Sequence, residues 1–177
     1  MTTKENVHLD ISIDNDEWTN ALPSYQNLIE KSFAEICKHV SEGRALSKFP
    51  HIEVSLVLCA DDLIHQLNHD YSEKDKATNV LSFCGLDKED INRFLKNDDT
   101  PENRPYSLGE IYIACETMQE EAKAAAICFE DHFQHLITHG LLHLLGYDHV
   151  NNDDAEIMEA LETSLLGNLG IDDPYAA

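Results

Sequence analysis

The sequence predicts an α+β fold, with a small mixed β-sheet of about four strands flanked by helices. Four segments are rich in β-branched residues or alternate between apolar and polar positions, which is typical of strands. They cover residues 7–14, 52–59, 79–83 and 108–114. Helical periods dominate after Ile113, and strands early with helices late favour a sheet covered by helices.

The helices are predicted by apolar residues that recur every three or four positions. Residues 23–40 show this period between the first two strands. Asp61 and Asp62 are suited to cap a short helix that continues through Leu67. Three further helices are expected over residues 116–129, 131–146 and 153–170.

The segment of residues 86–106 is polar and interrupted by prolines. We interpret it as a surface insertion with one or two helical turns around residues 91–95. Four of the 12 lysines and arginines lie here, and a solvated loop is the simpler interpretation of them. We take residues 1–177 as a single domain, because a chain of 177 residues can bury most of the surface that it exposes when unfolded.

The chain is strongly acidic, with a formal net charge of -22 and no lysine or arginine after Lys123. Affinity for nucleic acid comes mostly from these two residue types, so the composition weighs against a broad nucleic-acid surface. RNA binding would need a small local patch, a bound metal or a partner. No apolar run approaches the ~18 residues of a membrane span, and the N-terminal residues do not resemble a secretory signal. We therefore expect no membrane contact and a cytoplasmic location.

Five cysteines are scattered along the chain without a CxxC pair. They are Cys37, Cys59, Cys84, Cys115 and Cys128. In a reducing compartment we expect them to be small buried apolar residues rather than disulfides or cluster ligands.

The stretch HGLLHLLGYDH, from His139 to His149, holds three histidines at spacings of four and six. Residues four apart on a helix are surface neighbours, so His139 and His143 can hold one metal ion. Gly146 lies where the end of a helix favours a positive φ, and a reversal there would return His149 as a third ligand. The HxxxHxxGxxH spacing is a known way to present three imidazoles. The sequence therefore predicts a metal site at the C-terminal end of a central helix.

Three neutral imidazoles leave the charge of a divalent ion largely uncompensated and one position open, which favours hydrolysis over a purely structural role. We expect one zinc ion per chain, although histidines also bind other divalent transition metals. Zinc peptidases with this spacing carry a glutamate after the first histidine as general base, and that position here is Gly140. Peptide hydrolysis is therefore disfavoured. Asp148 or a backbone carbonyl is suited to orient an imidazole, and His135 is expected to support the site rather than to bind the metal.

The chain resembles the YbeY family of metal-dependent endoribonucleases. HGLLHLLGYDH matches one family signature nearly letter for letter, and LNHDYSEKDKATNVLSF, residues 67–83, matches the other. LGEIYIA, residues 108–114, matches the strand that precedes the metal helix. The resemblance covers roughly residues 50–170. It implies a zinc-type site on the three histidines and a small mixed sheet flanked by helices.

The resemblance also implies an endoribonuclease that prefers single strands, matures the 3′ end of small-subunit (16S) ribosomal RNA and acts in ribosome quality control. Its partners would be ribosomal RNA or the pre-ribosomal small subunit with its proteins. The candidates for RNA contact are Lys74, Lys76, Thr78 and Asn79. The two lysines fit a solvated loop equally well, and the other two residues fit the start of a strand.

Two positions depart from the family pattern. The arginine that usually follows the tyrosine of the second signature is Ser72 here, and serine cannot hold a phosphate bidentately. The usual Gly-Asp of the strand motif is Gly109 and Glu110, which keeps the carboxylate. The lost guanidinium and the acidic charge motivate an alternative: a ribosome assembly factor with a structural metal and little nuclease activity of its own.

Overall fold

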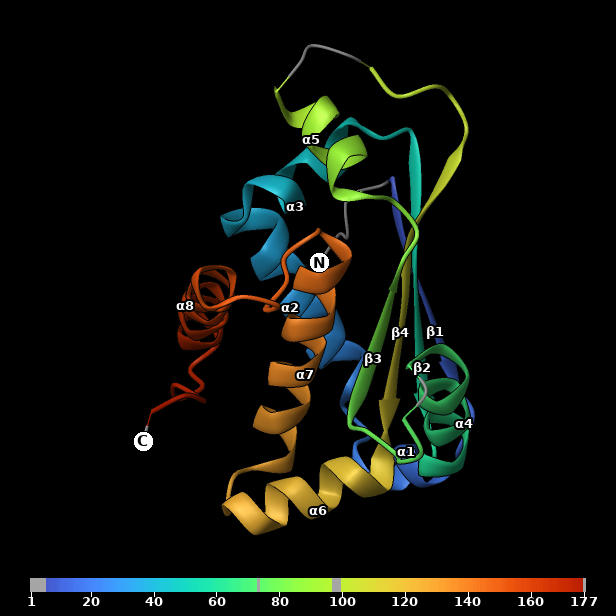
Figure 1. Cartoon of the computed structure of the whole chain (residues 1–177), viewed down its shortest axis with the longest axis vertical. Helices are drawn as coiled ribbons and strands as arrows, with labels where there is room; N and C mark the ends of the chain where they lie inside the picture. The colour runs from blue at the N-terminus through green and yellow to red at the C-terminus, as the bar shows by residue number, and fades with distance from the viewer. Residues whose placement is uncertain (1–5, 73, 97–99, 177) are drawn as a thin grey trace.

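The computed structural model describes residues 6–72, 74–96 and 100–176. Its centre is a four-stranded sheet with the order β1-β2-β4-β3 (Figure 1). β1, β2 and β4 are parallel, and β3 runs antiparallel to β4 at one edge. The strands are β1 (Val7–Ile13), β2 (His51–Cys59), β3 (Val80–Cys84) and β4 (Pro105–Ala114). The predicted α+β class with a four-stranded mixed sheet is confirmed.

Eight α-helices and one 3-10 turn connect these strands within the described residues. They are α1 (Glu17–Ala21), α2 (Tyr25–His39), α3 (Ser41–Ala45), the 3-10 turn (Leu46–Lys48), α4 (Asp61–Ser72), α5 (Lys88–Lys96), α6 (Cys115–Ala125), α7 (Phe129–Leu144) and α8 (Asn152–Asn168). The predicted long helices are present with shifted ends, and α4 continues past Leu67. α1 and α3 were not predicted, because five residues each are too few to show a helical period.

Trp18 explains why α1 forms despite its length. Its side chain is fully buried, and the indole Nε1 donates a hydrogen bond of 2.9 Å to the carbonyl of Cys59 at the end of β2. The ring also lies 5.6 Å from the ring of Phe133 in α7. A single aromatic anchor therefore fixes this short helix to both the sheet and the central helix.

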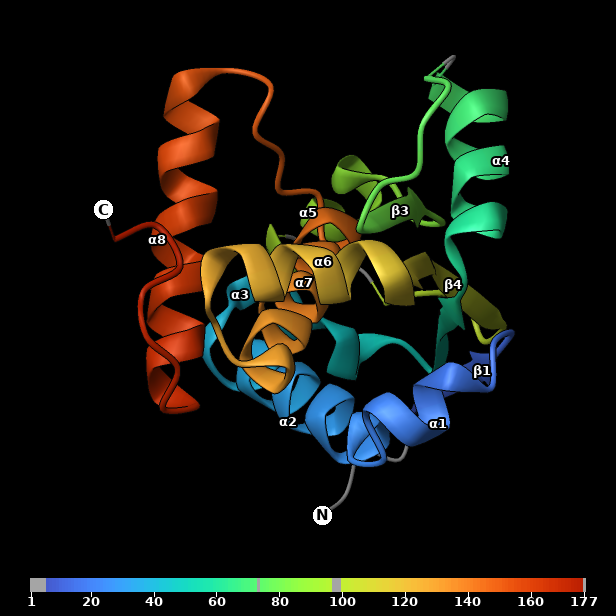
Figure 2. The ribbon, with the colours of Figure 1, turned by 90° about the horizontal axis from the view of Figure 1, so that it is seen from below.

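The sheet separates two layers of helices. α2 and α7 cover one face, α4 lies on the other, and α8 packs outside α7 (Figures 1 and 2). The burial of side chains alternates along β2. Every second residue is buried in the main core, namely Ile52, Val54, Leu56 and Leu58. α7 lies between the sheet and α8, so most of its residues are buried. This enclosure accounts for the apolar run around the three histidines.

The segment of residues 86–106 contains α5, which is longer than the one or two turns that the sequence predicts. Ile91 and Phe94 are buried, and the Phe94 ring packs edge-on against Phe49 at 5.2 Å. The Lys48 ammonium donates a 2.6 Å hydrogen bond to the Phe94 carbonyl. The apolar side of α5 thus joins the core. That residues 1–177 form one domain with this segment as an insertion stays a prediction.

The five cysteines are all free thiols. Cys59 and Cys115 are buried and Cys37 is half-buried, whereas Cys84 and Cys128 are exposed. The prediction of burial is therefore wrong for the last two, which lie at the end of β3 and just before α7. No helix in the described ranges has the length and apolar character needed to cross a membrane.

Candidate metal centre

Gly146 ends α7 and reverses the chain. It adopts a φ of 90°, its N–H donates to the carbonyl of His143 at 2.9 Å, and the N–H of Tyr147 donates to the carbonyl of Leu142 at 3.1 Å. These two hydrogen bonds form a Schellman cap, which favours glycine at the left-handed position. The predicted positive φ at Gly146 is confirmed, and the reversal carries His149 back toward the helix.

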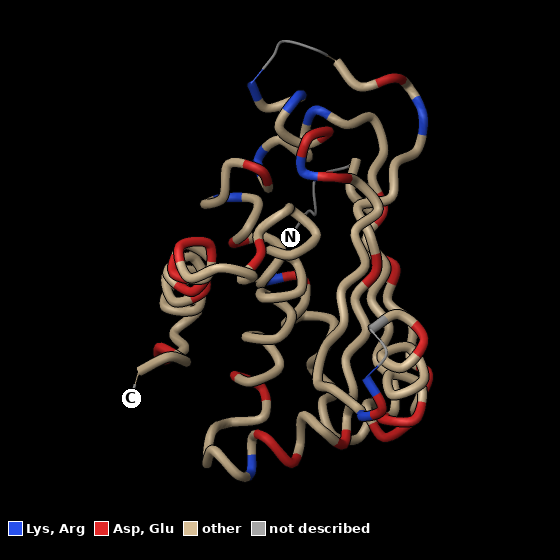
Figure 3. Tube along the Cα trace, in the orientation of Figure 1, with Lys and Arg blue, Asp and Glu red and all other residues tan. Residues whose placement is uncertain are grey.

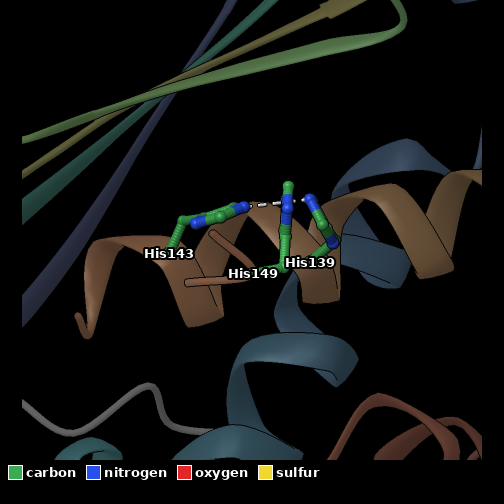
Figure 4. Close-up of side chains that lie close together, drawn as sticks. All are labelled: His139, His143 and His149. Atoms are coloured by element: carbon green, nitrogen blue, oxygen red, sulfur yellow. Dashed lines mark hydrogen bonds between the residues drawn. The ribbon is translucent and has the colours of Figure 1, made fainter. Parts of the chain in front are cut away.

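The three histidines converge at this reversal (Figure 4). The Nε2 atoms of His139 and His143 lie 3.0 Å apart, and the His149 ring centroid lies 5.4 Å and 5.0 Å from those two rings. One nitrogen from each residue lies within 4.8 Å of the other two. Among the described residues, no further His, Cys, Asp or Glu joins this cluster. The arrangement brings together the three residues that the sequence singles out.

Hydrogen bonds on the opposite ring nitrogens fix the two helical imidazoles. His139 Nδ1 lies 2.7 Å from a carboxylate oxygen of Glu162, and His143 Nδ1 lies 3.0 Å from the carbonyl oxygen of Tyr147. An ionised carboxylate and a carbonyl only accept hydrogen bonds, so both Nδ1 atoms carry the protons. In neutral rings the two Nε2 lone pairs then face each other across 3.0 Å. Such an arrangement is repulsive by itself and becomes favourable when a cation lies between the nitrogens.

Glu162 is a buried carboxylate beside the histidines. Its side chain has no exposed surface, and it accepts hydrogen bonds from His139, from His135 Nε2 at 3.0 Å and from the hydroxyl of Tyr175. Burial alone would raise the pKa of this carboxyl, but the three donors outweigh it and lower the pKa to about 2. A carboxylate in this position holds a ligand imidazole in one tautomer and one orientation.

The environment also keeps His143 neutral. Burial lowers its pKa, and the neighbouring His139 and His149 lower it further. A metal ligand must be an unprotonated imidazole. His143 therefore offers its Nε2 lone pair without the need to displace a proton first.

Residues 12–170 match the family model described as Endoribonuclease YbeY. The chain belongs to the endoribonuclease YbeY family. A relative of that name from Paramagnetospirillum magneticum is 39% identical over 169 residues, which is 96% of each chain. Another from Ruegeria pomeroyi is 40% identical and covers 94% of this chain and 97% of its own. The family is one of enzymes that cleave RNA by hydrolysis.

A solved structure supports the fold. The solution structure of a Thermotoga maritima protein aligns with 96% of this chain and 100% of its own, with a TM-score of 0.50 and 19% sequence identity. At that identity the similarity shows a shared fold. The sheet and the helices that position the histidines are therefore not peculiar to this YbeY sequence.

The four residues predicted to contact RNA lie in and after the loop between α4 and β3 of this YbeY chain. Lys74 and Lys76 are exposed, and Thr78 is half-buried. The side chain of Asn79 is already engaged, because its Nδ2 donates to Glu121 at 2.9 Å and its Oδ1 accepts from the N–H of Val80 at 2.7 Å. Asn79 therefore secures the loop to α6. Between described residues, no hydrogen bond or ion pair joins any of the four to His139, His143 or His149, so RNA contact stays a prediction for them.

The positions at which this chain departs from the YbeY or the peptidase pattern lie in different parts of the structure. The side chain of Ser72 lies outside the described part of the chain. Glu110 lies on β4 and accepts a 2.9 Å hydrogen bond from the hydroxyl of Tyr112. Gly140 packs against the sheet, and a Cβ there would lie 3.0 Å from Ile111 and 3.1 Å from Ser82. A side chain at position 140 would therefore require Ile111 and Ser82 to shift by a few tenths of an ångström. That this is not a peptidase site stays a prediction.

Three residues of the YbeY site were not singled out from the sequence. Glu162 and Tyr175 orient His139 and His135, and the Tyr147 carbonyl orients His143. Of the two predicted orienting groups, a backbone carbonyl fills the role, that of Tyr147, and Asp148 instead accepts a hydrogen bond from the N–H of His149 at 2.8 Å. The available signal was the position of Glu162 on α8, since it falls among the buried Met158, Leu165 and Leu166. A carboxylate on the apolar side of a helix indicates a buried partner.

Proposed function

We propose that His139, His143 and His149 bind one divalent metal ion per chain, with zinc as the first choice. Zinc binds imidazole nitrogens at about 2.0–2.1 Å, so two nitrogens on a tetrahedral ion are about 3.3 Å apart. The 3.0 Å between the two Nε2 atoms is close to this value. The donor set also fits, because the Nδ1 atoms of His139 and His143 are engaged as in known metal sites, and three imidazole ligands are typical of a catalytic site with an open position.

We further propose that the protein is a metal-dependent endoribonuclease that prefers single-stranded RNA. Its relatives are named endoribonucleases, and the donor set of three imidazoles supports a hydrolytic role. A bound metal would supply a Lewis acid for a phosphate oxygen and a water of lowered pKa. The chain's own contribution is orientation: Glu162 and the Tyr147 carbonyl hold His139 and His143 with their Nε2 lone pairs directed at one point.

The proposed substrate is the 3′ end of small-subunit (16S) ribosomal RNA, in the cytoplasm, with the pre-ribosomal particle as partner. The net charge of -22 leaves little capacity for nonspecific RNA binding. A partner particle that presents its RNA would compensate for this. The substrate is therefore proposed to be delivered within a ribonucleoprotein rather than captured as free RNA.

A second candidate function is a ribosome assembly factor whose metal is structural. The observation that favours it is the connectivity of the site, since the histidines and Glu162 together join α7, the following turn and α8. A metal here would fasten the C-terminal helix whether or not RNA is cleaved. Ser72 in place of the family arginine also favours this alternative.

Cleavage of a single-stranded RNA that carries the 3′ end of the small-subunit rRNA separates the two. We expect the purified protein to cleave it, a chelator to abolish cleavage, and His143→Ala to be inactive. His69→Ala is the matched control, since His69 is exposed and its ion pair among the described residues is with the adjacent Asp70. Cleavage that survives both chelation and His143→Ala would reject the nuclease mechanism. Absence of cleavage by the zinc-loaded wild type, with rescue of ribosome maturation by that protein, would favour the assembly factor.

A further inference from the structure

An exposed aromatic cluster lies at the C-terminal end of α4. Tyr71 is 71% exposed, although its ring centroid lies only 4.9 Å from that of Phe83 on β3 at an interplanar angle of 57°. Phe83 in turn packs edge-on against Tyr112 of β4 at 5.9 Å. Two rings attached to the sheet thus support a third ring that is largely accessible to solvent. We call Tyr71 and Phe83 the aromatic platform.

The platform and the helix of the metal centre contact opposite faces of the same strand, β3. Phe83 precedes Cys84, whose thiol donates to the carbonyl of His143 at 3.3 Å. The end of β3 therefore lies directly against the helix that carries the metal ligands. β3 is also an edge strand. The C-terminal end of α4 and the N-terminal end of α8 lie on the same side of the molecule (Figure 2).

Two lysines lie in the loop that follows the platform residue Tyr71. Lys74 and Lys76 follow Tyr71 closely and are exposed, and the buried amide of Asn68 holds their loop to α4 through a 2.9 Å hydrogen bond to the Lys76 carbonyl. Much of the remaining surface is acidic, and the visible Lys and Arg positions concentrate around α3 and α5, with a second small group at this loop (Figure 3). Two exposed lysines thus lie in the loop that directly follows α4 and Tyr71.

We propose that Tyr71, supported by Phe83, stacks on an unpaired base of the RNA strand that enters the metal centre. The inference rests on the proposed endoribonuclease function and adds the position of one nucleotide contact. Stacking between bases and aromatic rings is independent of base identity and is worth a large share of single-strand binding. It also requires no positive charge, which matches a chain with a net charge of -22.

The platform also accounts for how the chain tolerates Ser72. A serine at the position of the family arginine removes a bidentate phosphate contact. A stacked base held by the preceding residue retains the strand without that contact. A double-stranded substrate has its bases already stacked, so the platform favours single strands.

The test is binding of a short fluorescein-labelled oligouridylate to the full zinc-loaded protein, measured by anisotropy with probe integrity checked on gels. Tyr71→Ala and Tyr71→Leu are expected to weaken binding by about 5- to 150-fold, whereas Tyr71→Phe retains the wild-type dissociation constant. Ile157→Ala is the matched control, because Ile157 is an exposed apolar residue on α8. The salt dependence of binding should be unchanged in Tyr71→Leu, since no ion pair is lost.

Each outcome is decisive. Wild-type affinity in Tyr71→Ala, or in Tyr71→Leu, would overturn the platform, and so would a reduced salt slope in Tyr71→Leu. Because Tyr71 is largely exposed, both variants should have the thermal unfolding midpoint of the wild type. If Tyr71→Ala nevertheless fails to fold, the affinity of Tyr71→Leu tests the proposal. A failure of the nuclease proposal is distinguishable from this result: the zinc-loaded wild type would then bind the probe but leave the target RNA intact.

Discussion

Replacement of Glu162 by glutamine tests how the metal site is built. The carboxylate accepts from His139 on one oxygen and from His135 and Tyr175 on the other. Glutamine has one acceptor oxygen and one NH2 donor. If its oxygen faces His135 and Tyr175, the NH2 group faces His139 and forces that ring to carry its proton on Nε2, which blocks metal binding. If its oxygen faces His139, the NH2 group faces the two other donors.

The magnitude follows from these contacts. A hydrogen bond to a charged group contributes about 1.5–3 kcal/mol. The bond from His139 is lost in the first orientation of the amide, and the bonds from His135 and Tyr175 are lost in the second. Rotation of His135 or Tyr175 to accept a proton recovers part of the second loss, so we expect Glu162→Gln to lower the free energy of unfolding by about 1–3 kcal/mol. Loss of a carboxylate that orients a ligand costs about 10- to 100-fold in metal affinity.

The assay is urea unfolding of the metal-free protein, together with competition for zinc against a chromogenic chelator. Glu156→Gln on the exposed side of the same helix is the control and should match the wild type in both. Wild-type zinc affinity in Glu162→Gln would refute the argument that the buried carboxylate selects the imidazole tautomer.

Three further substitutions test the elements that hold the site. Gly146→Ala should destabilise the protein by about 1 kcal/mol or more, because a residue with a Cβ is strained at positive φ. The control is Gly167→Ala, where the space around the glycine is open, and it should change stability by less than about 1 kcal/mol. Thermal denaturation measures both. Trp18→Phe loses the buried hydrogen bond to β2 and part of a packed ring, and should cost about 1–3 kcal/mol in urea unfolding; an unchanged free energy of unfolding would show that the indole does not anchor α1. Asn79→Ala removes the contacts with Glu121 and the β3 backbone and should cost about 1–2 kcal/mol; an unchanged unfolding midpoint would show that Asn79 does not secure the loop.

The histidine triad was predictable because its geometry is local. His139 and His143 share one helical face, and Gly146 sets the reversal within the next turn, so spacing alone places the rings. The strands were readable for a similar reason, since β2 alternates along its own length. Patterns of this kind need no knowledge of which distant segments meet.

The rest of the site depends on tertiary contacts. Glu162 lies 23 residues from His139 in sequence, and its place on the apolar side of α8 indicates a buried partner without indicating which one. Asn79 was predicted to contact RNA because its bond to Glu121 joins segments 42 residues apart and is not visible in the sequence. α5 seemed superficial because its buried contacts with Phe49 come from another part of the chain. Sequence periodicity reports which side of an element is buried, and it does not report the partner.

Zinc K-edge absorption spectroscopy on the purified, zinc-loaded protein tests the central claim most directly. We predict one zinc ion per chain with three imidazole nitrogens at about 2.0–2.1 Å and one oxygen from solvent, and no bound zinc in His143→Ala. A fourth protein ligand, a sulfur neighbour such as Cys84, or undiminished zinc in His143→Ala would contradict the proposed open metal site.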